Sequence, residues 1–382
     1  MDKPQKIMIV AGEASGDKLG AALVAEMNRL SSPRSVEWFG AAGPQMRDAG
    51  VEAVVKADEM SVVGIAEILR ALPMFYGKFR QLKALANERR PDVVVLVDLP
   101  DFNLKLAKSL KRAGHKVVFY VSPQLWAWRS GRRRTIAKYV DLLLTILPFE
   151  NDWYAERGIS NVEFVGNPHA TEVKATKTRE EFLGGLGLDP VAQTIVLMPG
   201  SRTNEVDRIF PVMAEAAGEI RKRVAGAQFV VALANDKHQQ FVNDSVRSAF
   251  NVVVADTYNA LAAADAAVVK CGTGTLEAGI IGTPMVNVYK TSALNYFLIR
   301  PLVHSKYYSL VDLVADERIA EELIQSELTP KRLSDEVIKL LDPEENAAFR
   351  ERLKVVNERL GPTDASRRAA EAILRVLMLD VS

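Results

Sequence analysis

The chain has 382 residues, of which 48% are hydrophobic, and its 49 Lys and Arg nearly balance its 48 Asp and Glu. That length exceeds what one ordinary hydrophobic core supports, so two domains are expected. The lone Cys271 excludes an intramolecular disulfide, and no apolar run reaches the roughly 18–20 residues that cross a bilayer. We therefore expect a cytoplasmic protein, soluble or peripheral to a membrane. Its four histidines lie far apart, so no metal site is predicted.

Apolar, β-rich runs alternate with helical patterns along the first half of the chain, which predicts a parallel sheet crossed by helices. Strands are expected at residues 7–10, 36–39, 93–97, 117–121, 142–147 and 162–165. Helices are expected at residues 19–29, 75–89 and 104–113.

The same alternation restarts after a polar stretch at residues 171–180. Strands are expected at 194–198, 228–232, 266–270 and 285–288, with a helix at 209–224. The predicted fold is therefore α/β, with two Rossmann-like doubly wound domains, 1–168 and 169–345, that face a cleft. No strand follows residue 345, so we expect the helices of 346–382 to cross back onto the N-terminal domain.

The segment Ala-Gly-Glu-Ala-Ser-Gly-Asp-Lys-Leu-Gly at residues 11–20 joins the first strand to the first helix. Open α/β sheets bind ligands at the carboxyl ends of their strands, and glycines there let a ligand approach the main chain. A loop that only holds a pyrophosphate would not gain from two carboxylates, Glu13 and Asp17. The spacing also differs from Gly-x-Gly-x-x-Gly, which argues against a nicotinamide cofactor. Glu13 and Asp17 are therefore candidate functional residues at this edge.

Asp98 ends the apolar strand 93–97 and begins the segment Asp-Leu-Pro-Asp-Phe-Asn. A carboxylate at this edge can accept a proton from a hydroxyl, so Asp98 is a candidate general base. Asp101 and Asn103 follow closely, and either could instead cap the next helix.

Trp126, Trp128 and Arg129 follow the strand 117–121, within a stretch (102–138) of ten basic residues and no acid. This aromatic and basic surface fits nucleic acid, an anionic lipid surface, or a packed Trp pair with solvated arginines. We expect no nucleic-acid binding, because the basic run is a local patch on a near-neutral chain. The apolar segment 60–79, which includes Leu69, Leu72 and Phe75, could contact acyl chains or form a core helix.

Two turns of the second half suit a diphosphate. Gly200, Ser201 and Arg202 follow the strand 194–198, where backbone N–H groups, a helix dipole and a guanidinium can hold an anion. Gly272, Thr273, Gly274 and Thr275 follow the strand 266–270, and Glu277 is suited to ribose hydroxyls. Cys271, which has no histidine nearby in the sequence, reads as a small buried residue.

With these segments placed, the chain resembles the lipid-A-disaccharide synthase family of GT-B glycosyltransferases. The matching motifs run in the family's order over nearly the whole chain: Ala11 to Asp17, Gly43-Pro44-Gln45-Met46, Asp98 to Asn103, Ser122 to Trp128, Leu147-Pro148-Phe149-Glu150, Pro199 to Arg202 and Gly272 to Glu277. The elements Pro-Gln-Leu-Trp-Ala-Trp and Asp-Leu-Pro-Asp-Phe-Asn carry most of the specificity.

The resemblance implies an inverting transfer of 2,3-diacylglucosamine from its UDP form to 2,3-diacylglucosamine 1-phosphate, giving the β-1,6 disaccharide 1-phosphate and UDP. It implies no metal or other cofactor. The N-terminal domain would take the acceptor, with Asp98 as the base and with Glu13 and Asp17 positioning sugar hydroxyls or assisting the base. The C-terminal domain would bind UDP through Arg202 and the 272–277 loop. It also implies a peripheral location on the cytoplasmic face of the inner membrane, and a homodimer is one further expectation.

The chain departs from the family pattern at Asp312, where the family has Asn. This change adds a negative charge at a position that the resemblance puts close to the diphosphate. The alternatives to the transferase are a related transferase or epimerase acting on another UDP-sugar, and a non-catalytic binder.

Overall fold

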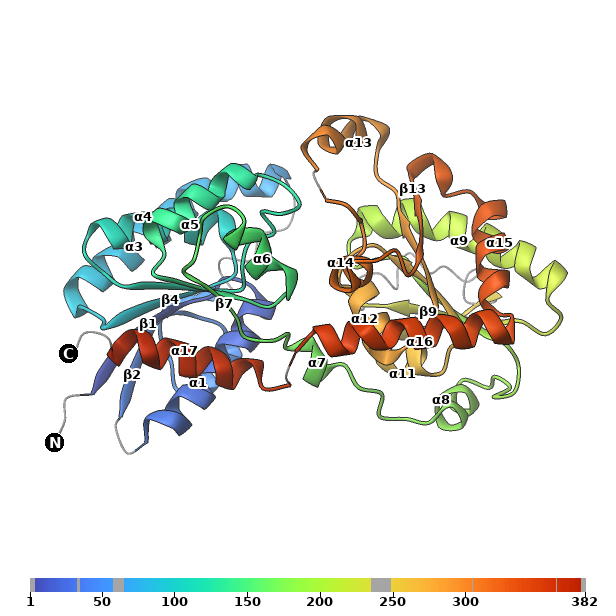
Figure 1. The fold of residues 1–382 in the computed structure, drawn as a ribbon, viewed down its shortest axis with the longest axis horizontal. Coiled ribbons are helices and arrows are strands. Elements are labelled where there is room, and N and C mark those ends of the chain that lie inside the picture. The colour runs from blue at the N-terminus through green and yellow to red at the C-terminus, as the bar shows by residue number, and fades with distance from the viewer. Residues whose placement is uncertain are drawn as a thin grey trace. The chain divides into compact units, whose positions relative to one another are not determined.

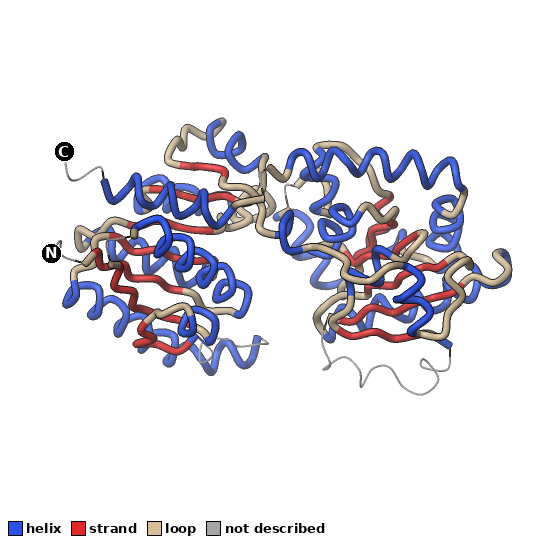
Figure 2. Tube along the Cα trace, turned by 90° about the horizontal axis from the view of Figure 1, so that it is seen from below, coloured by secondary structure: helices blue, strands red, loops and turns tan. Residues whose placement is uncertain are grey.

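The structure, a computed structural model, describes residues 4–32, 35–57, 65–234, 249–303, 305–361 and 363–378. The chain divides into two compact units, residues 1–168 with 362–382 and residues 169–361. Each unit is built from parallel strands on the inside and helices on the outside (Figures 1 and 2).

The first unit contains a seven-stranded parallel sheet in the order β3-β2-β1-β4-β5-β6-β7. Its strands are β1 (Gln5–Val10), β2 (Val36–Ala42), β3 (Glu52–Lys56), β4 (Val93–Val97), β5 (Val117–Tyr120), β6 (Leu142–Thr145) and β7 (Val162–Phe164). Since β1 pairs with β2 on one side and β4 on the other, the winding direction reverses between β1 and β4. In doubly wound sheets this reversal opens a crevice at the carboxyl ends of the two strands.

Helices cover both faces of the first sheet, which explains why its strands are apolar along their whole length. The helices of this unit are α1 (Ala14–Ser31), α2 (Pro44–Asp48), α3 (Ile65–Arg89), α4 (Pro100–Arg112), α5 (Arg133–Tyr139), α6 (Phe149–Ala155) and α17 (Ala365–Met378), with a 3-10 turn η2 (Ser130–Arg132). In β4, Val94 and Leu96 pack under α3, α4 and α5, whereas Val93, Val95 and Val97 pack under α1 and α17.

The second unit contains a six-stranded parallel sheet in the order β10-β9-β8-β11-β12-β13. Its strands are β8 (Thr194–Met198), β9 (Gln228–Leu233), β10 (Asn251–Val254), β11 (Ala266–Lys270), β12 (Met285–Tyr289) and β13 (Glu321–Ile324). Here the winding reverses between β8 and β11. The two parallel sheets confirm the predicted doubly wound α/β class.

The helices of the second unit are α7 (His169–Glu172), α8 (Arg179–Gly185), α9 (Thr203–Arg223), α11 (Thr257–Ala262), α12 (Thr273–Ile281), α13 (Ala293–Ile299), α14 (Leu310–Ala315), α15 (Pro330–Leu340) and α16 (Pro343–Arg359), with the 3-10 turns η4 (Arg300–Leu302) and η5 (Gln325–Glu327). α9 and α15 bury one face of the sheet. α12 packs with α11, α14 and α16.

The C-terminal segment does not pack as one body, so the expectation that 346–382 crosses back as a whole is wrong for α16. This helix buries Phe349, Leu353 and Val356 in the second unit. The Arg350 guanidinium donates to the carbonyls of Gly282 (2.8 Å) and Ala264 (3.0 Å), which follow the C-terminal ends of α12 and α11 in that unit. Buried carbonyls at such ends need donors, and α16 supplies them.

α17 belongs to the first unit, where it lies beside α1 (Figure 1). Ala369, Ala370 and Ile373 are fully buried against the face of the sheet that α1 also covers. The Arg375 guanidinium pairs with Glu163 at 2.7 Å, close to the end of β7. Without α17, part of that face would be left exposed to water.

Candidate active site

In the first unit, the loops that follow β1 and β4 pack directly on each other at the reversal point. A Cβ on Gly12 would lie 2.4 Å from Leu99 Cδ2, so a larger residue there would require the Leu99 side chain to shift. This contact brings the segment that begins at Glu13 next to the segment that begins at Asp98. The sequence predicted both segments, and their proximity follows from the strand order.

Asp98 lies at the end of β4 in a strained backbone conformation. Both Asp98 and Leu99 have φ of +50°, a region that costs a non-glycine residue about 1 kcal/mol or more. The Asp98 N–H donates to the Tyr120 carbonyl at 2.9 Å, and the buried Asn103 amide donates to the Asp98 carbonyl at 2.8 Å. These bonds hold the carboxylate at the edge of the sheet, and they show that Asn103 positions Asp98 rather than capping α4.

The environment of Asp98 suits a proton acceptor. Burial raises the pKa of its carboxyl, and the negative charge of Glu13 raises it further. Glu13 itself is exposed at the N-terminus of α1. A carboxylate whose pKa is raised toward neutrality is a better general base than an ordinary aspartate.

The structure contradicts the catalytic role predicted for Asp17, because its carboxylate already accepts hydrogen bonds within the fold. It is 2% exposed and accepts N–H bonds from Gly43 (2.8 Å), Gln45 (2.9 Å) and Met46 (3.2 Å) at the start of α2. A carboxylate there stabilises the helix N-terminus and satisfies its orphan donors. Asp17 is therefore a structural anchor and not a catalytic group.

The two tryptophans have different environments. Trp126 is buried, with its indole N–H donated to Glu150 (3.2 Å) and its ring edge-to-face with Phe149. Burial raises the pKa of Glu150 to about 8 against its hydrogen bonds. Trp128 is exposed, and the Arg129 guanidinium stacks on its ring at 4.2 Å. The interpretation as a packed pair is thus right for Trp126 alone.

Asp101 does not cap α4; it binds the cations of the adjacent loop. Its carboxylate pairs with Arg129 at 3.1 Å and also with Arg132. The residue at the N-cap of α4 is Leu99. Part of the positive charge of this loop is therefore neutralised within the unit.

Segment 60–79 lies partly outside the described residues, which omit 58–64 and the side chains of 65–71, including Leu69. Phe75 packs on Phe102 with ring centroids 6.2 Å apart, as core residues do. Leu72 and Tyr76, four residues apart on α3, are 53% and 65% exposed. The described part of α3 therefore has both a core face and an exposed apolar edge.

In the second unit, the loops after β8 and β11 also meet at the reversal point. Gly200 and Gly272 have φ of +123° and +151°, which favours glycine at both turns. A Cβ on Gly274 would lie 3.2 Å from Met198 Cε, so α12 begins close against the end of β8. Thr273 is exposed in the first turn of α12, where backbone N–H groups can face an anion.

The structure reveals an ion pair at this point that sequence reasoning missed. Lys270 Nζ lies 2.8 Å from Glu205 Oε1, and both side chains are mostly buried. The Ser201 N–H donates to the other Glu205 oxygen at 3.2 Å, and Arg202, which is 80% exposed, approaches Glu205 at 3.5 Å. Burial alone would raise the pKa of Glu205, but Lys270 lowers it below its usual value. The position of Lys270, the last residue of the predicted strand 266–270, is the sequence feature that could have indicated a cation at this edge.

Thr275 has a role different from the one predicted, whereas Glu277 is only placed differently. The Thr275 hydroxyl is buried, donates to the Gly272 carbonyl (2.8 Å) and accepts from the Leu310 N–H (3.1 Å), so it stabilises the loop. Glu277 lies in the second turn of α12, one turn beyond the N–H groups at the start of the helix. It is half-buried beside the Tyr258 hydroxyl, and burial raises its pKa.

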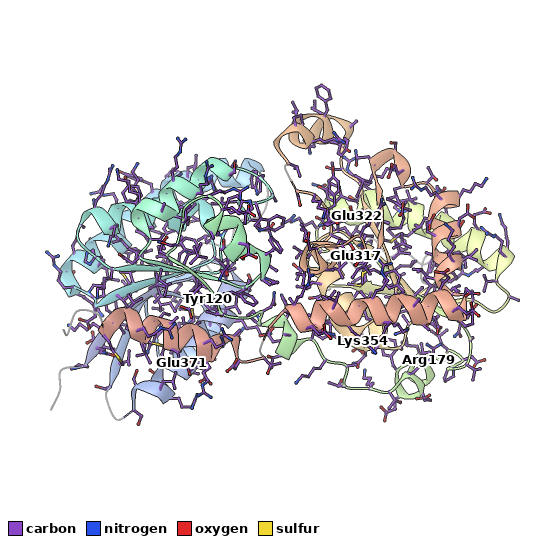
Figure 3. All side chains as sticks on the ribbon, viewed as in Figure 1. Tyr120, Arg179, Glu317, Glu322, Lys354 and Glu371 are labelled. Atoms are coloured by element: carbon purple, nitrogen blue, oxygen red, sulfur yellow. The ribbon has the colours of Figure 1, made fainter. Side chains whose placement is uncertain are left out.

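Asp312 does not face an anion site. It is fully buried, accepts from the Ser309 hydroxyl (2.7 Å) and from the Ile319 and Ala320 N–H groups, and burial raises its pKa. Glu322, labelled in Figure 3, holds the Ser309 N–H in the same way (2.7 Å). Cys271 is also buried, and burial raises the pKa of its thiol, which disfavours the reactive thiolate.

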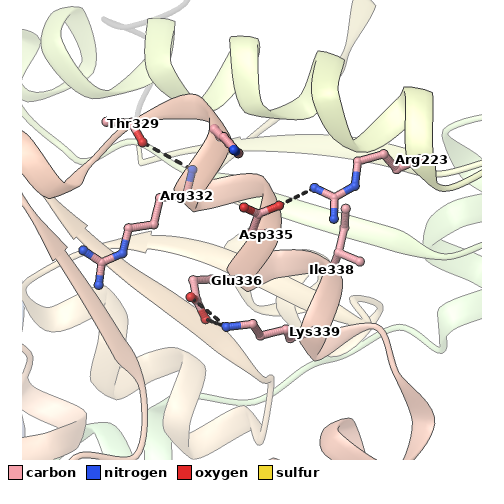
Figure 4. A pocket seen from close by; sticks show the side chains of 8 residues that line it. Arg223, Thr329, Arg332, Asp335, Glu336, Ile338 and Lys339 are labelled. Atoms are coloured by element: carbon pink, nitrogen blue, oxygen red, sulfur yellow. Dashed lines mark hydrogen bonds and ion pairs between the residues drawn. The ribbon is translucent and has the colours of Figure 1, made fainter.

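A further hollow, of about 580 Å³, lies between the last turn of α9 and α15 (Figure 4). Both of its carboxylates are paired with lining cations, Asp335 with Arg223 and Glu336 with Lys339. The 21 residues of α9 separate it from the 200–205 loop by about 30 Å. This hollow is therefore not part of the site at the carboxyl edge.

Among the described residues, no group of three or more His, Cys, Asp or Glu is arranged to hold a metal ion. Within the same part of the chain, no helix is both long and apolar enough to span a membrane.

Two doubly wound parallel α/β units are the architecture of the GT-B fold, and solved structures share this fold. UDP-GlcNAc 2-epimerase from Neisseria meningitidis bound to UDP-GlcNAc has a TM-score of 0.66 at 14% identity, covering 97% of this chain and 100% of that one. The calicheamicin glycosyltransferase CalG4 has a TM-score of 0.58 at 16% identity, with 100% of both chains covered. At these identities the likeness concerns the fold alone.

Sequence comparisons identify the family within this class. The profile of the Lipid-A-disaccharide synthetase family matches residues 7–375. The lipid-A-disaccharide synthase of Trichlorobacter lovleyi is 41% identical over 379 residues, with 98% of each chain covered. That of Myxococcus xanthus is 42% identical over 383 residues, with 99% of each covered. The chain belongs to the lipid-A-disaccharide synthase family of glycosyltransferases.

Proposed function

We propose that this protein transfers 2,3-diacylglucosamine from its UDP form to 2,3-diacylglucosamine 1-phosphate, with inversion, to give the β-1,6 disaccharide 1-phosphate and UDP. Family membership over residues 7–375 supports the reaction, and the environment of Asp98 carries the assignment of the base. The epimerase and the non-catalytic binder are not favoured by the family match.

Asp98 accepts the proton of the acceptor 6-hydroxyl as that oxygen attacks the anomeric carbon of the donor sugar. The new C–O bond forms as the bond from C1 to the diphosphate oxygen breaks, and UDP leaves with the electron pair. Glu13 contributes by raising the pKa of Asp98, which strengthens the base. Raising a carboxyl pKa toward the working pH is a common way to tune general bases.

The second unit binds the UDP group in this proposal. The turns at Gly200 and Gly272 present backbone N–H groups, and Arg202 is exposed enough to turn onto a phosphate. Lys270 supplies a second cation, which Glu205 holds in place before the nucleotide binds. Glu277 is suited to ribose hydroxyls. Preorganised donors and cations of this kind stabilise a departing diphosphate.

Both proposed substrates carry acyl chains, so they would lie in a membrane and the protein would meet them at the membrane surface. We propose that the protein is peripheral on the cytoplasmic face of the inner membrane, with Trp128, Arg129 and Leu72 on the lipid side of the first unit. Exposure of Trp128 and Leu72 supports this assignment. A homodimer remains part of the proposal, and sedimentation of the purified protein tests it.

The variant Asp98→Asn tests the base directly. It should lower kcat for UDP release with both substrates by about 10²–10⁴-fold while UDP affinity is unchanged. Asp101→Asn, a nearby exposed carboxylate, is the matched control and should stay close to the parent protein. Near-normal turnover of Asp98→Asn would remove this residue from the base role.

A further inference from the structure

The helix α13 of the second unit exposes an apolar stripe to solvent. Leu294, Phe297 and Leu298 are 67%, 77% and 56% exposed. They lie at positions i, i+3 and i+4, which places them on one face of the helix. Such a stripe normally faces a core, yet the main packing partner of α13 is the adjoining turn η4, and α13 stands apart from the other helices of its unit (Figure 1).

The surroundings of this stripe are positively charged. Residues 290–306 include Lys290, Arg300 and Lys306 and contain no Asp or Glu. A groove of about 1030 Å³ runs beside α13, and among the described residues that line it are the cations Arg208, Lys290 and Arg300 but no carboxylate. The Arg300 guanidinium donates to the Tyr296 hydroxyl at 3.0 Å, which keeps one cation at the rim of the groove.

This combination differs from ordinary surface exposure of a single apolar residue. Val191 is 91% exposed, but it lies in a loop next to Asp189 and forms no stripe. Isolated exposed residues of that kind are common in soluble proteins and need no partner. An exposed apolar stripe flanked by cations is instead the pattern of helices that lie in a membrane interface, where apolar residues enter the acyl boundary and cations meet lipid phosphates.

We propose that α13 and its cationic groove form a lipid-contact surface on the second unit, with an anionic bilayer as the occupant. Leu294, Phe297 and Leu298 insert below the head groups, and Arg208, Lys290 and Arg300 contact lipid phosphates. This surface is additional to the exposed edge of α3 on the first unit. The inference rests on the proposed function, since a donor that carries acyl chains would be taken up from a bilayer.

Vesicle flotation of the full chain tests the proposal, with vesicles of phosphatidylcholine alone or with a quarter phosphatidylglycerol. The triple variant Leu294→Ser/Phe297→Ser/Leu298→Ser should weaken partitioning onto the anionic vesicles by about tenfold or more. Lys290→Gln/Arg300→Gln should weaken binding to the anionic vesicles and leave binding to the neutral ones unchanged. Val191→Ser, which removes an apolar side chain that is more exposed than Leu294, Phe297 or Leu298, should change neither.

Two further measurements separate the outcomes. UDP release from substrates dispersed in detergent micelles should stay within about twofold in the triple variant, because micelles deliver lipid without a bilayer. Unchanged vesicle binding in both variants would overturn the proposal. So would lost micellar turnover, which would place α13 in the substrate site, or a change from dimer to monomer in sedimentation with vesicle binding intact. If the parent protein released no UDP from micelles, the proposed function would fail while the vesicle result stood.

Discussion

In both units two loops meet at the point where the strand order reverses, but the side chains there have opposite charges. In the first unit, the loops after β1 and β4 bring together the carboxylates of Glu13 and Asp98. In the second, the loops after β8 and β11 bring together two positive-φ glycines, Arg202 and Lys270. One doubly wound scaffold can thus present a proton acceptor or an anion site, depending on the side chains at its carboxyl edge.

The two edges also differ in how their charges are held. Asp98 has no cation among its hydrogen-bond partners described here, and burial raises its pKa. Glu205, although buried, has Lys270 at 2.8 Å and a lowered pKa. A buried carboxylate without a cation beside it has a raised proton affinity and can act as a base. A buried carboxylate paired with a cation stays charged and holds that cation in position.

Among the variants that test this difference between the two units, Lys270→Met should have the largest effect. UDP affinity should fall by about 10–100-fold, because the proposed diphosphate contact loses a cation. Stability should also fall by about 2 kcal/mol, since Glu205 would be left buried without its partner. Isothermal titration with UDP and thermal unfolding measure the two effects.

The double variant Lys270→Met/Glu205→Gln separates these effects. It should recover much of the stability and none of the affinity, because the unpaired charge is gone and the cation is still missing. Lys222→Met, an exposed lysine in the last turn of α9, is the control for losing a positive charge. UDP affinity equal to that of the parent in Lys270→Met would show that the ion pair is purely structural.

An intermediate effect is expected for Asp17→Asn, and it should be confined to stability. The free energy of unfolding should fall by about 1–2 kcal/mol, because three N–H groups at the start of α2 lose their charged acceptor. The kcat of the folded protein should stay near that of the parent. Asp48→Asn, on the exposed end of α2, should have little effect on either quantity. A large fall in kcat at unchanged stability would contradict the structural role and show that Asp17 takes part in catalysis.

The smallest expected effect is a shift in the pH dependence of kcat/KM in the variant Glu13→Gln. The base must be ionised to act, so activity falls as pH drops through the pKa of Asp98. Removing the Glu13 charge removes one cause of the raised pKa, so the acid limb of kcat/KM should move to lower pH. Burial, the larger cause, remains. Glu26→Gln, farther along α1, should leave the limb in place, and a limb that moves to higher pH in Glu13→Gln would contradict the assignment.

Much of the fold could be predicted because buried parallel strands are apolar on both faces and stand out as continuous runs. β4 and β11 are examples. The strands β3, β10 and β13 were missed. For β13, the buried Glu322 explains why, since a buried acid does not look like a strand residue. The packing of α16 was also missed. Its anchor, Arg350, reads as a solvated charge until the carbonyls of Gly282 and Ala264 are placed beside it.

For the candidate site, the sequence determined which residues occupy the carboxyl ends of the strands, since a carboxylate or glycine directly after an apolar run must lie there. It thereby determined the positions of Glu13, Asp98, Gly200 and Gly272. Only the tertiary structure decided which of the polar side chains are already used within the fold. Asp17 and Asp312 are saturated by N–H donors, and Thr275 holds its own loop. The partners of Asp17 and Thr275 lie 26 and 35 residues away, so no local pattern reveals them. The donors to Asp312 lie within eight residues, but they face it only because the chain turns back between α14 and β13.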